Sequence, residues 1–168
     1  PRPAAPPQAA EAAARRGPVV EVALITEYGP GQPAPRLSPD MEAKMQAIKA
    51  RVEAELQTRF EGVTNVERVQ VEVGPVQQRD PRTGRTFDVV GIKMNFFDAN
   101  GASLGHADGA YIPDYFGADT AYYRSIYLEG AARGQNVPSR LNEVFDSAFR
   151  EVGITRIFTH AEEDGLVV

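Results

Sequence analysis

Residues 38–62, SPDMEAKMQAIKARVEAELQTRFEG, carry the longest stretch of the chain with a single clear period. Large apolar side chains recur there at steps of three and four, which places one apolar stripe along a helix. Ser38 suits an N-cap, Pro39 the first helical position and Gly62 a left-handed stop, so we expect a helix over 38–61. The stripe consists of Met41, Met45, Ile48, Val52, Leu56 and Phe60.

A helix with one apolar stripe has to bury it, and the β-rich segments on both sides offer a sheet as partner. Residues 19–28 are rich in β-branched side chains and hardly alternate, so we expect a central first strand there. Alternation predicts strands at 67–74 and 86–98, a short strand near a sheet edge at 102–107, and a last strand at 154–158.

The rest of the chain completes the fold class. An amphipathic helix is expected at 138–152, and Asp119 is a candidate cap for another helix that reaches Arg133. Glu55 and Arg59 are expected to pair on the solvated side of the long helix. The sequence therefore predicts a single α+β domain, a mostly antiparallel sheet in the order β-α-β-β-β-α-β with the helices packed on one face.

Composition limits the classes of partner. The net charge is −5 and the sequence pI is near 5.1, without a basic block, so we expect no nucleic acid partner. Apolar runs are shorter than the roughly 18 residues that a membrane-spanning helix needs. The chain has no cysteine, which excludes disulfides and thiolate metal sites within these residues.

The two ends differ in composition from the middle. Residues 1–18, rich in proline and alanine, lack large apolar side chains, so we expect a disordered tether before a domain at 19–160, with a frayed terminus as the equal alternative. Residues 161–168 are expected to form a loose tail. The chain opens at Pro1 without an initiator methionine, so we expect either a trimmed sequence or a processed protein, and processing would favour export.

Few residues suggest chemistry. Asp98 begins an Asp-Ala-Asn-Gly segment that resembles the start of a calcium loop but lacks its later ligands, so we expect a hairpin turn. The only candidates for a metal site or an acid–base pair are His106, Asp108, Asp114 and His160. Their spacing matches no known motif, so we predict no catalytic residue, cofactor or metal.

Two surfaces could bind a partner. Three arginines at one predicted hairpin tip could meet an acidic partner, although solvated loop charge is the simpler interpretation: Arg79, Arg82 and Arg85. An aromatic segment is a candidate interface, with core packing as the equal alternative, because tyrosine pairs an apolar ring with a polar tip. Its members are Tyr111, Tyr115, Phe116, Tyr122, Tyr123 and Tyr127.

The predicted architecture resembles that of small periplasmic lipoproteins of Gram-negative bacteria. The resemblance covers about residues 19–158 and rests on the order of elements, on VVEVALITEY and on the MNFFDANGASL hairpin, all behind a Pro/Ala-rich leader. It implies a periplasmic domain, tethered to the outer membrane by a lipid anchor upstream of Pro1. No site residue transfers, and the lipidated cysteine of that family is not in this sequence.

The first hypothesis is therefore a non-enzymatic assembly or scaffold domain of the cell envelope with protein partners. The alternative is a structural subunit of a larger particle, such as a phage tail, a pilus or a secretion device. A hydrolase-like enzyme is the third and least favoured hypothesis, because it would require a histidine to converge with carboxylates.

Overall fold

A computed structural model describes residues 17–25, 27–29, 31–33, 36–79, 83–128, 135–161 and 166–167. The predicted tether over 1–16 lies outside the described residues, as does Arg82. Pro18 is already buried, and the backbone of Gly17 lies against the carbonyl oxygen of Gln57. In the described part of the chain, no helix has a segment long and apolar enough to cross a membrane.

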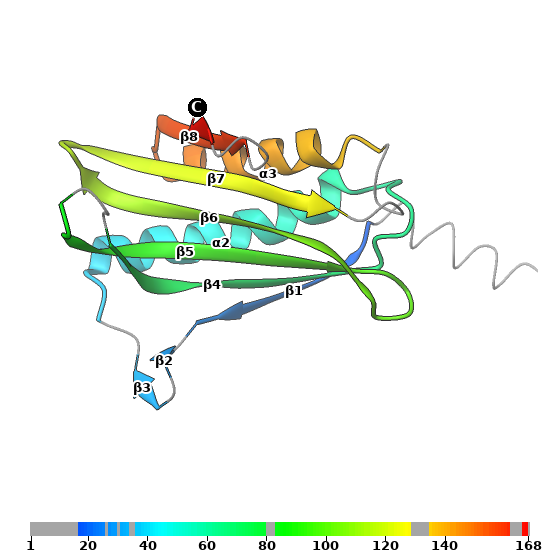
Figure 1. The fold of residues 1–168 in the computed structure, drawn as a ribbon, viewed down its shortest axis with the longest axis horizontal. Coiled ribbons are helices and arrows are strands. Elements are labelled where there is room, and N and C mark those ends of the chain that lie inside the picture. Colours follow the sequence, from blue (N-terminus) through cyan, green and yellow to red (C-terminus); the bar gives the residue numbers. More distant parts are fainter. Residues whose placement is uncertain are drawn as a thin grey trace, which may run out of the picture.

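The described strands form one large sheet with two helices on one face (Figure 1). A separate short hairpin joins β2 (Glu27–Gly29) and β3 (Gln32–Pro33). In spatial order the sheet contains β1 (Val19–Leu24), β4 (Arg68–Arg79), β5 (Thr86–Phe97), β6 (Ser103–Tyr115), β7 (Ala118–Leu128), β8 (Arg156–Ala161) and β9 (Leu166–Val167).

Only two of the strand pairings in this sheet are parallel, β1 with β4 and β7 with β8. Helix α2 (Pro39–Arg59) connects the first pair and helix α3 (Val137–Glu151) the second, as parallel neighbours require. The other pairings are antiparallel. The predicted α+β class, with a mostly antiparallel sheet and helices on one face, is confirmed.

The long helix begins and buries its stripe as predicted. The Ser38 hydroxyl accepts a hydrogen bond from the backbone N–H of Met41 at 3.2 Å, and Gly62 has a φ of 78°. Most of the stripe is buried against the sheet and α3, because the side chains share one face. The buried members are Met45, Ile48, Val52, Leu56 and Phe60, while Met41 is half-buried.

Glu55 does not lie on a solvated side, which corrects that prediction. Its side chain is 14% exposed and lies between α2 and α3, where it accepts hydrogen bonds from Arg59 Nε at 2.7 Å and from the Ser147 hydroxyl at 3.2 Å. Burial alone would raise the pKa of Glu55, but these donors outweigh it and lower that pKa. The pair therefore helps to join the two helices.

Helix α3 packs on β6 and β7 through aromatic contacts. Phe145 stacks on Tyr123 of β7, with ring centroids 4.8 Å apart and planes within 8°. Gly109 of β6 makes room for this ring, since a Cβ atom there would lie 3.0 Å from Phe145 Cε1. The helix spans almost the predicted range and starts after Asn136, whose φ is 59°.

The first strand is an edge strand in the described sheet, not the predicted central one. It ends at Leu24, and only β4 pairs with it. Val20 and Val22 are half-buried beside the core, whereas Val19 is 59% and Leu24 37% exposed. The apolar run without alternation, a pattern typical of a central strand, thus belongs to a strand that pairs on one side only in the described sheet.

The second half of the meander also differs from the prediction. The expected short edge strand at 102–107 is β6, thirteen residues long and central, and the expected helix from Asp119 is the strand β7. Ala121 and Tyr123 face the helices while Tyr122 between them faces away, which is the period of a strand. The predicted order therefore lacked β7.

The chain's C-terminal part adds β8, which starts two residues later than the predicted strand at 154–158. Within the predicted loose tail, Leu166 and Val167 pair with Ala161 and His160 as β9. The other residues of 162–168 lie outside the described ones.

Candidate functional site

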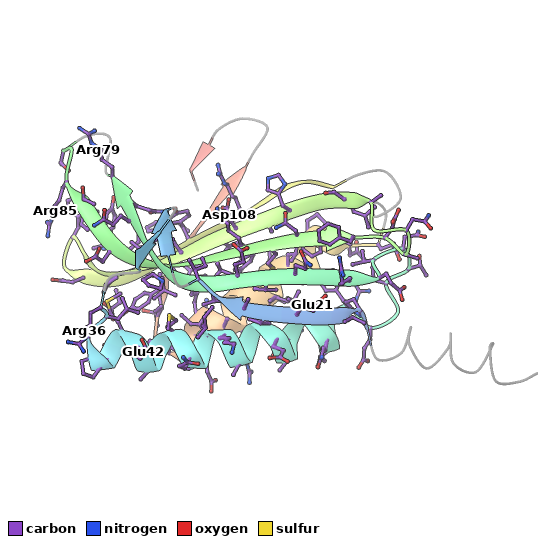
Figure 2. All side chains as sticks on the ribbon, turned by 90° about the horizontal axis from the view of Figure 1, so that it is seen from below. Glu21, Arg36, Glu42, Arg79, Arg85 and Asp108 are labelled. Atoms are coloured by element: carbon purple, nitrogen blue, oxygen red, sulfur yellow. The ribbon has the colours of Figure 1, made fainter. Side chains whose placement is uncertain are left out.

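Two hairpins finish at the same end of the sheet (Figure 1). The last described pair of the β4–β5 hairpin is Arg79 with Thr86, and the last pair of the β6–β7 hairpin is Tyr115 with Ala118. Figure 2 shows Arg79 and Arg85 projecting at this end of the molecule. Because Tyr115 pairs with Ala118, the two residues between them, 116 and 117, have to reverse the direction of the chain.

This turn exposes an aromatic side chain. Phe116 and Gly117 have φ angles of 49° and 89°, as the two central residues of a type I′ turn require. Phe116 is 58% exposed. Its ring contacts Tyr115 edge-on at 4.5 Å between centroids, and Tyr115 contacts Phe87 of β5 edge-on at 5.4 Å. We call Phe87, Tyr115 and Phe116 the aromatic tip.

A small second core supports the aromatic tip on the sheet face away from the helices. Because side chains alternate along a strand, Val89 faces away from the main core that Val90 joins. The buried members are Val89, Ala110 and Ile112, with Val76, Phe87, Tyr115 and Tyr122 half-buried around them. The Tyr122 hydroxyl accepts a hydrogen bond from Gln78, and burial raises the pKa of Tyr122. The rings at the tip therefore stand on a packed base.

Arginines lie at the same end of the sheet as the aromatic tip, and two of them contact it. The Arg85 guanidinium lies 4.8 Å from the centroid of the Phe87 ring, and Arg156 of β8 donates to the Tyr115 carbonyl oxygen at 3.2 Å. Together with exposed Arg79 they form the arginine rim. Among the described residues, no carboxylate lies within ion-pair distance of the arginine rim, whereas several arginines elsewhere have such a partner: Arg51, Arg59, Arg68 and Arg124.

The predicted aromatic segment divides between core and surface. Tyr111 and Tyr123 are buried in the main core, and Tyr122 is half-buried in the second one. Only Tyr115 and Phe116 reach the tip, and the side chain of Tyr127 lies outside the described residues. Phe87 and Arg156 were not among the predicted site residues, because nothing local in the sequence shows that β5, β6 and β8 meet here.

The four residues considered for metal binding or acid–base chemistry are not brought together where they are described. His106 is exposed near the start of β6, and Asp108 accepts from Arg124 Nε at 3.1 Å on the face away from the helices (Figure 2). Asp114 lies at the far end of β6, and the side chain of His160 is outside the described residues. The described residues contain no group of three histidine, aspartate or glutamate side chains placed to hold a metal ion.

The Asp98 segment is the turn that we predicted. The Asp98 carboxylate accepts from the backbone N–H groups of Asn100 and Ala102, both at 2.9 Å. Gly101 has a φ of 81°, which favours glycine. The carboxylate therefore stabilises the β5–β6 hairpin by bonding to its own backbone.

A charged cluster ties α2 to the β6–β7 hairpin. Lys44 Nζ lies 3.1 Å from Asp40 and 3.2 Å from Asp119, and it donates to the Tyr111 hydroxyl at 3.3 Å. Asp40 above all raises the pKa of Lys44. The backbone N–H of Asp114, at 2.9 Å, and then Lys44 lower the pKa of Asp119. Burial raises the pKa of Tyr111. Each polar group here has a partner, so the cluster serves as a structural link.

This link gives a pH-dependent prediction. Folding lowers the pKa of Asp119, so its stabilisation is complete above the ordinary value of 3.8 and is lost as the pH falls through the lower folded value. We expect Asp119→Asn to melt below the wild type at about pH 7, by a modest amount because the carboxylate is 40% exposed. Thermal unfolding followed by circular dichroism should show the two melting temperatures converging below pH 3.8. A difference that is independent of pH would contradict a role for the charge.

Comparisons with models of known protein families, with curated proteins and with solved structures find no match to this chain.

Proposed function

We propose that the protein is a non-enzymatic assembly or scaffold domain of the bacterial cell envelope that binds another protein through its aromatic tip. The observation that carries the proposal is the 58% exposure of Phe116 on a packed aromatic base. Aromatic and arginine side chains are enriched in the parts of protein interfaces that contribute most to affinity. The rim of arginines supports the same interpretation.

The cellular location in this proposal is supported by the sequence alone. The Pro/Ala-rich segment before the domain suits a spacer between an anchor and a folded unit. The resemblance to periplasmic lipoproteins implies the same arrangement. We therefore place the domain in the periplasm, tethered to the outer membrane.

Crosslinking in the native cells tests both parts of the proposal. A photoreactive amino acid is introduced at position 116 in one variant and, as a control, at position 53, where Glu53 is exposed on α2. We expect position 116 alone to capture a defined protein, and the product to fractionate with the cell envelope. Equal capture at both positions, capture at neither, or recovery with cytoplasmic proteins would contradict the proposal.

The free edge of β1 supports the alternative function, a structural subunit of a larger particle. In the described sheet no strand lies beyond β1, and its Val19 and Leu24 side chains are exposed. An exposed edge of this kind can accept a strand from another chain. Ordered polymers that grow with protein concentration, seen by electron microscopy and abolished by Leu24→Lys, would favour this alternative over the first.

A further inference from the structure

We infer that the aromatic tip and the arginine rim together bind an acidic segment of a partner polypeptide, with Phe116 as the apolar anchor and Arg79 and Arg85 as contacts to carboxylates. This inference rests on the proposed function and adds the chemistry of the partner. Three features of the structure support it: the backbone at Phe116, the charge at the rim, and the kind of cation found there.

The backbone at Phe116 is the first feature. A type I′ turn needs positive φ at both central positions and prefers asparagine or glycine first, whereas this turn has a phenylalanine with a φ of 49°. A bulky side chain in this region is strained. Its ring contacts Tyr115 but is 58% exposed, so burial in a core does not account for the choice. Strained residues of this kind cluster at active sites, ligand clamps and switch regions, so the backbone at Phe116 favours a binding role for the tip.

The charge at the rim is the second feature. The chain as a whole carries a net charge of −5, yet the two charged side chains with a described contact to the tip, Arg85 and Arg156, are cations, and exposed Arg79 lies at the same end of the sheet. Arg85 is held by the Phe87 ring and Arg156 by a backbone carbonyl oxygen. A guanidinium stacked on a ring keeps its N–H edge available for a carboxylate. The rim is thus complementary to negative charge.

The kind of cation is the third feature, and it favours an acidic polypeptide over an anionic membrane as the partner. The described rim consists of arginine, which recognises carboxylates through two parallel hydrogen bonds. A common surface for binding anionic membranes is an amphipathic helix rich in basic residues, whereas the tip is formed by two hairpins. A polypeptide that combines carboxylates with an apolar side chain matches both parts of the site.

The chain contains no tryptophan, which makes a direct binding assay possible. The probe is a short synthetic peptide of glutamates with one tryptophan, and its counterpart has glutamine at each glutamate position. When the full chain is added, we expect the tryptophan emission of the acidic peptide to shift to the blue and to saturate. The glutamine peptide should not bind, and added salt should weaken the binding of the acidic peptide.

Three variants assign the binding to residues. The double variant Arg79→Gln with Arg85→Gln should weaken the acidic peptide about tenfold. Phe116→Asn should weaken it about thirtyfold, while the melting temperature stays equal or rises because asparagine accepts positive φ. The control Lys93→Gln removes an exposed positive charge in the middle of β5 and should leave the affinity unchanged.

Other results would overturn the inference. Equal binding of the two peptides would remove the role of the carboxylates, and unchanged affinity in the arginine variant would remove the role of the rim. Binding of phosphatidylglycerol vesicles without binding of the peptide would assign the tip to a membrane. Self-association that the arginine variant abolishes would assign it to a second copy of the chain. If position 116 crosslinks to a protein in cells but the purified chain does not bind the acidic peptide, this inference alone is overturned. If neither the crosslink nor the peptide binding is seen, the proposed function is overturned as well.

Discussion

Phe145→Ala is expected to lower the free energy of unfolding by about 3 to 5 kcal/mol, a large part of the total stability of a domain. The ring is fully buried, stacks on Tyr123 and on Phe149, and lies against Gly109. Its removal leaves a cavity between α3 and the sheet that the rigid strands of the meander cannot fill. Urea unfolding followed by circular dichroism measures the loss.

Glu53→Ala is the matched control for this measurement, because Glu53 is exposed on the other helix. It should change the free energy of unfolding by less than about 0.5 kcal/mol. If Phe145→Ala cost no more than this control, the packing of α3 on β6 and β7 would be wrong.

Gly74→Ala is expected to cost about 1 to 3 kcal/mol through overpacking. A Cβ atom at this position would lie 2.5 Å from the Cβ of Ile25 and 2.7 Å from its carbonyl oxygen. Ile25 would have to move, although its N–H donates to the Val73 carbonyl oxygen at 2.8 Å. Hydrogen exchange should therefore show faster exchange of the β1 amides, while those of β5 and β6 stay protected.

Gly101→Ala separates this clash from backbone strain. Its φ is 81°, so alanine is strained there, but no atom lies within 4 Å of the added Cβ. We expect a cost of about 1 to 2 kcal/mol with unchanged exchange in β1. If the β1 amides exchanged faster in both variants, the effect of Gly74→Ala could not be assigned to its clash with Ile25.

The helices could be predicted from the sequence because their signals are local. The Ser38 cap, the apolar period and Gly62 all belong to one short segment. The place of a strand in a sheet is not local, which is why the apolar run of β1 was assigned to the centre. Its position follows from the crossover through α2, which returns the chain to β4 on one side only.

The β6–β7 hairpin was missed for a different reason. The dipeptides that signal a type I′ turn are Asn-Gly, Asp-Gly and Gly-Gly, and here the turn is Phe116-Gly117. Pro113 also argues against a long strand, but it lies where the pairing with β7 shifts register, the place in which a strand tolerates proline. Phe116 thus removed the usual sequence signal of this hairpin, and it is also the exposed residue of the aromatic tip.

The aromatic tip could not be predicted from the sequence, because its residues and those of the arginine rim come from strands far apart in the chain. The arginines of the β4–β5 connection and the aromatic segment were both visible in the sequence, yet as separate surfaces. Their contact depends on the register of β5 with β6, which brings Phe87 to Tyr115. Arg156 joins them only because β8 pairs in parallel with β7.

The two parallel crossovers also determine the order in which the chain can fold. The antiparallel strands β4 to β7 are joined by short connections such as Phe116-Gly117, so they can close as hairpins within microseconds. The strands β1 and β8 can pair only after α2 and α3 have brought distant segments together, and the entropy of closing these longer loops slows them. We therefore expect pulse-labelled hydrogen exchange to detect protection in β5 and β6 first and in β1 last. Until the helices dock, the apolar face of the meander stays open to water, and that interval is when the chain is most prone to aggregate.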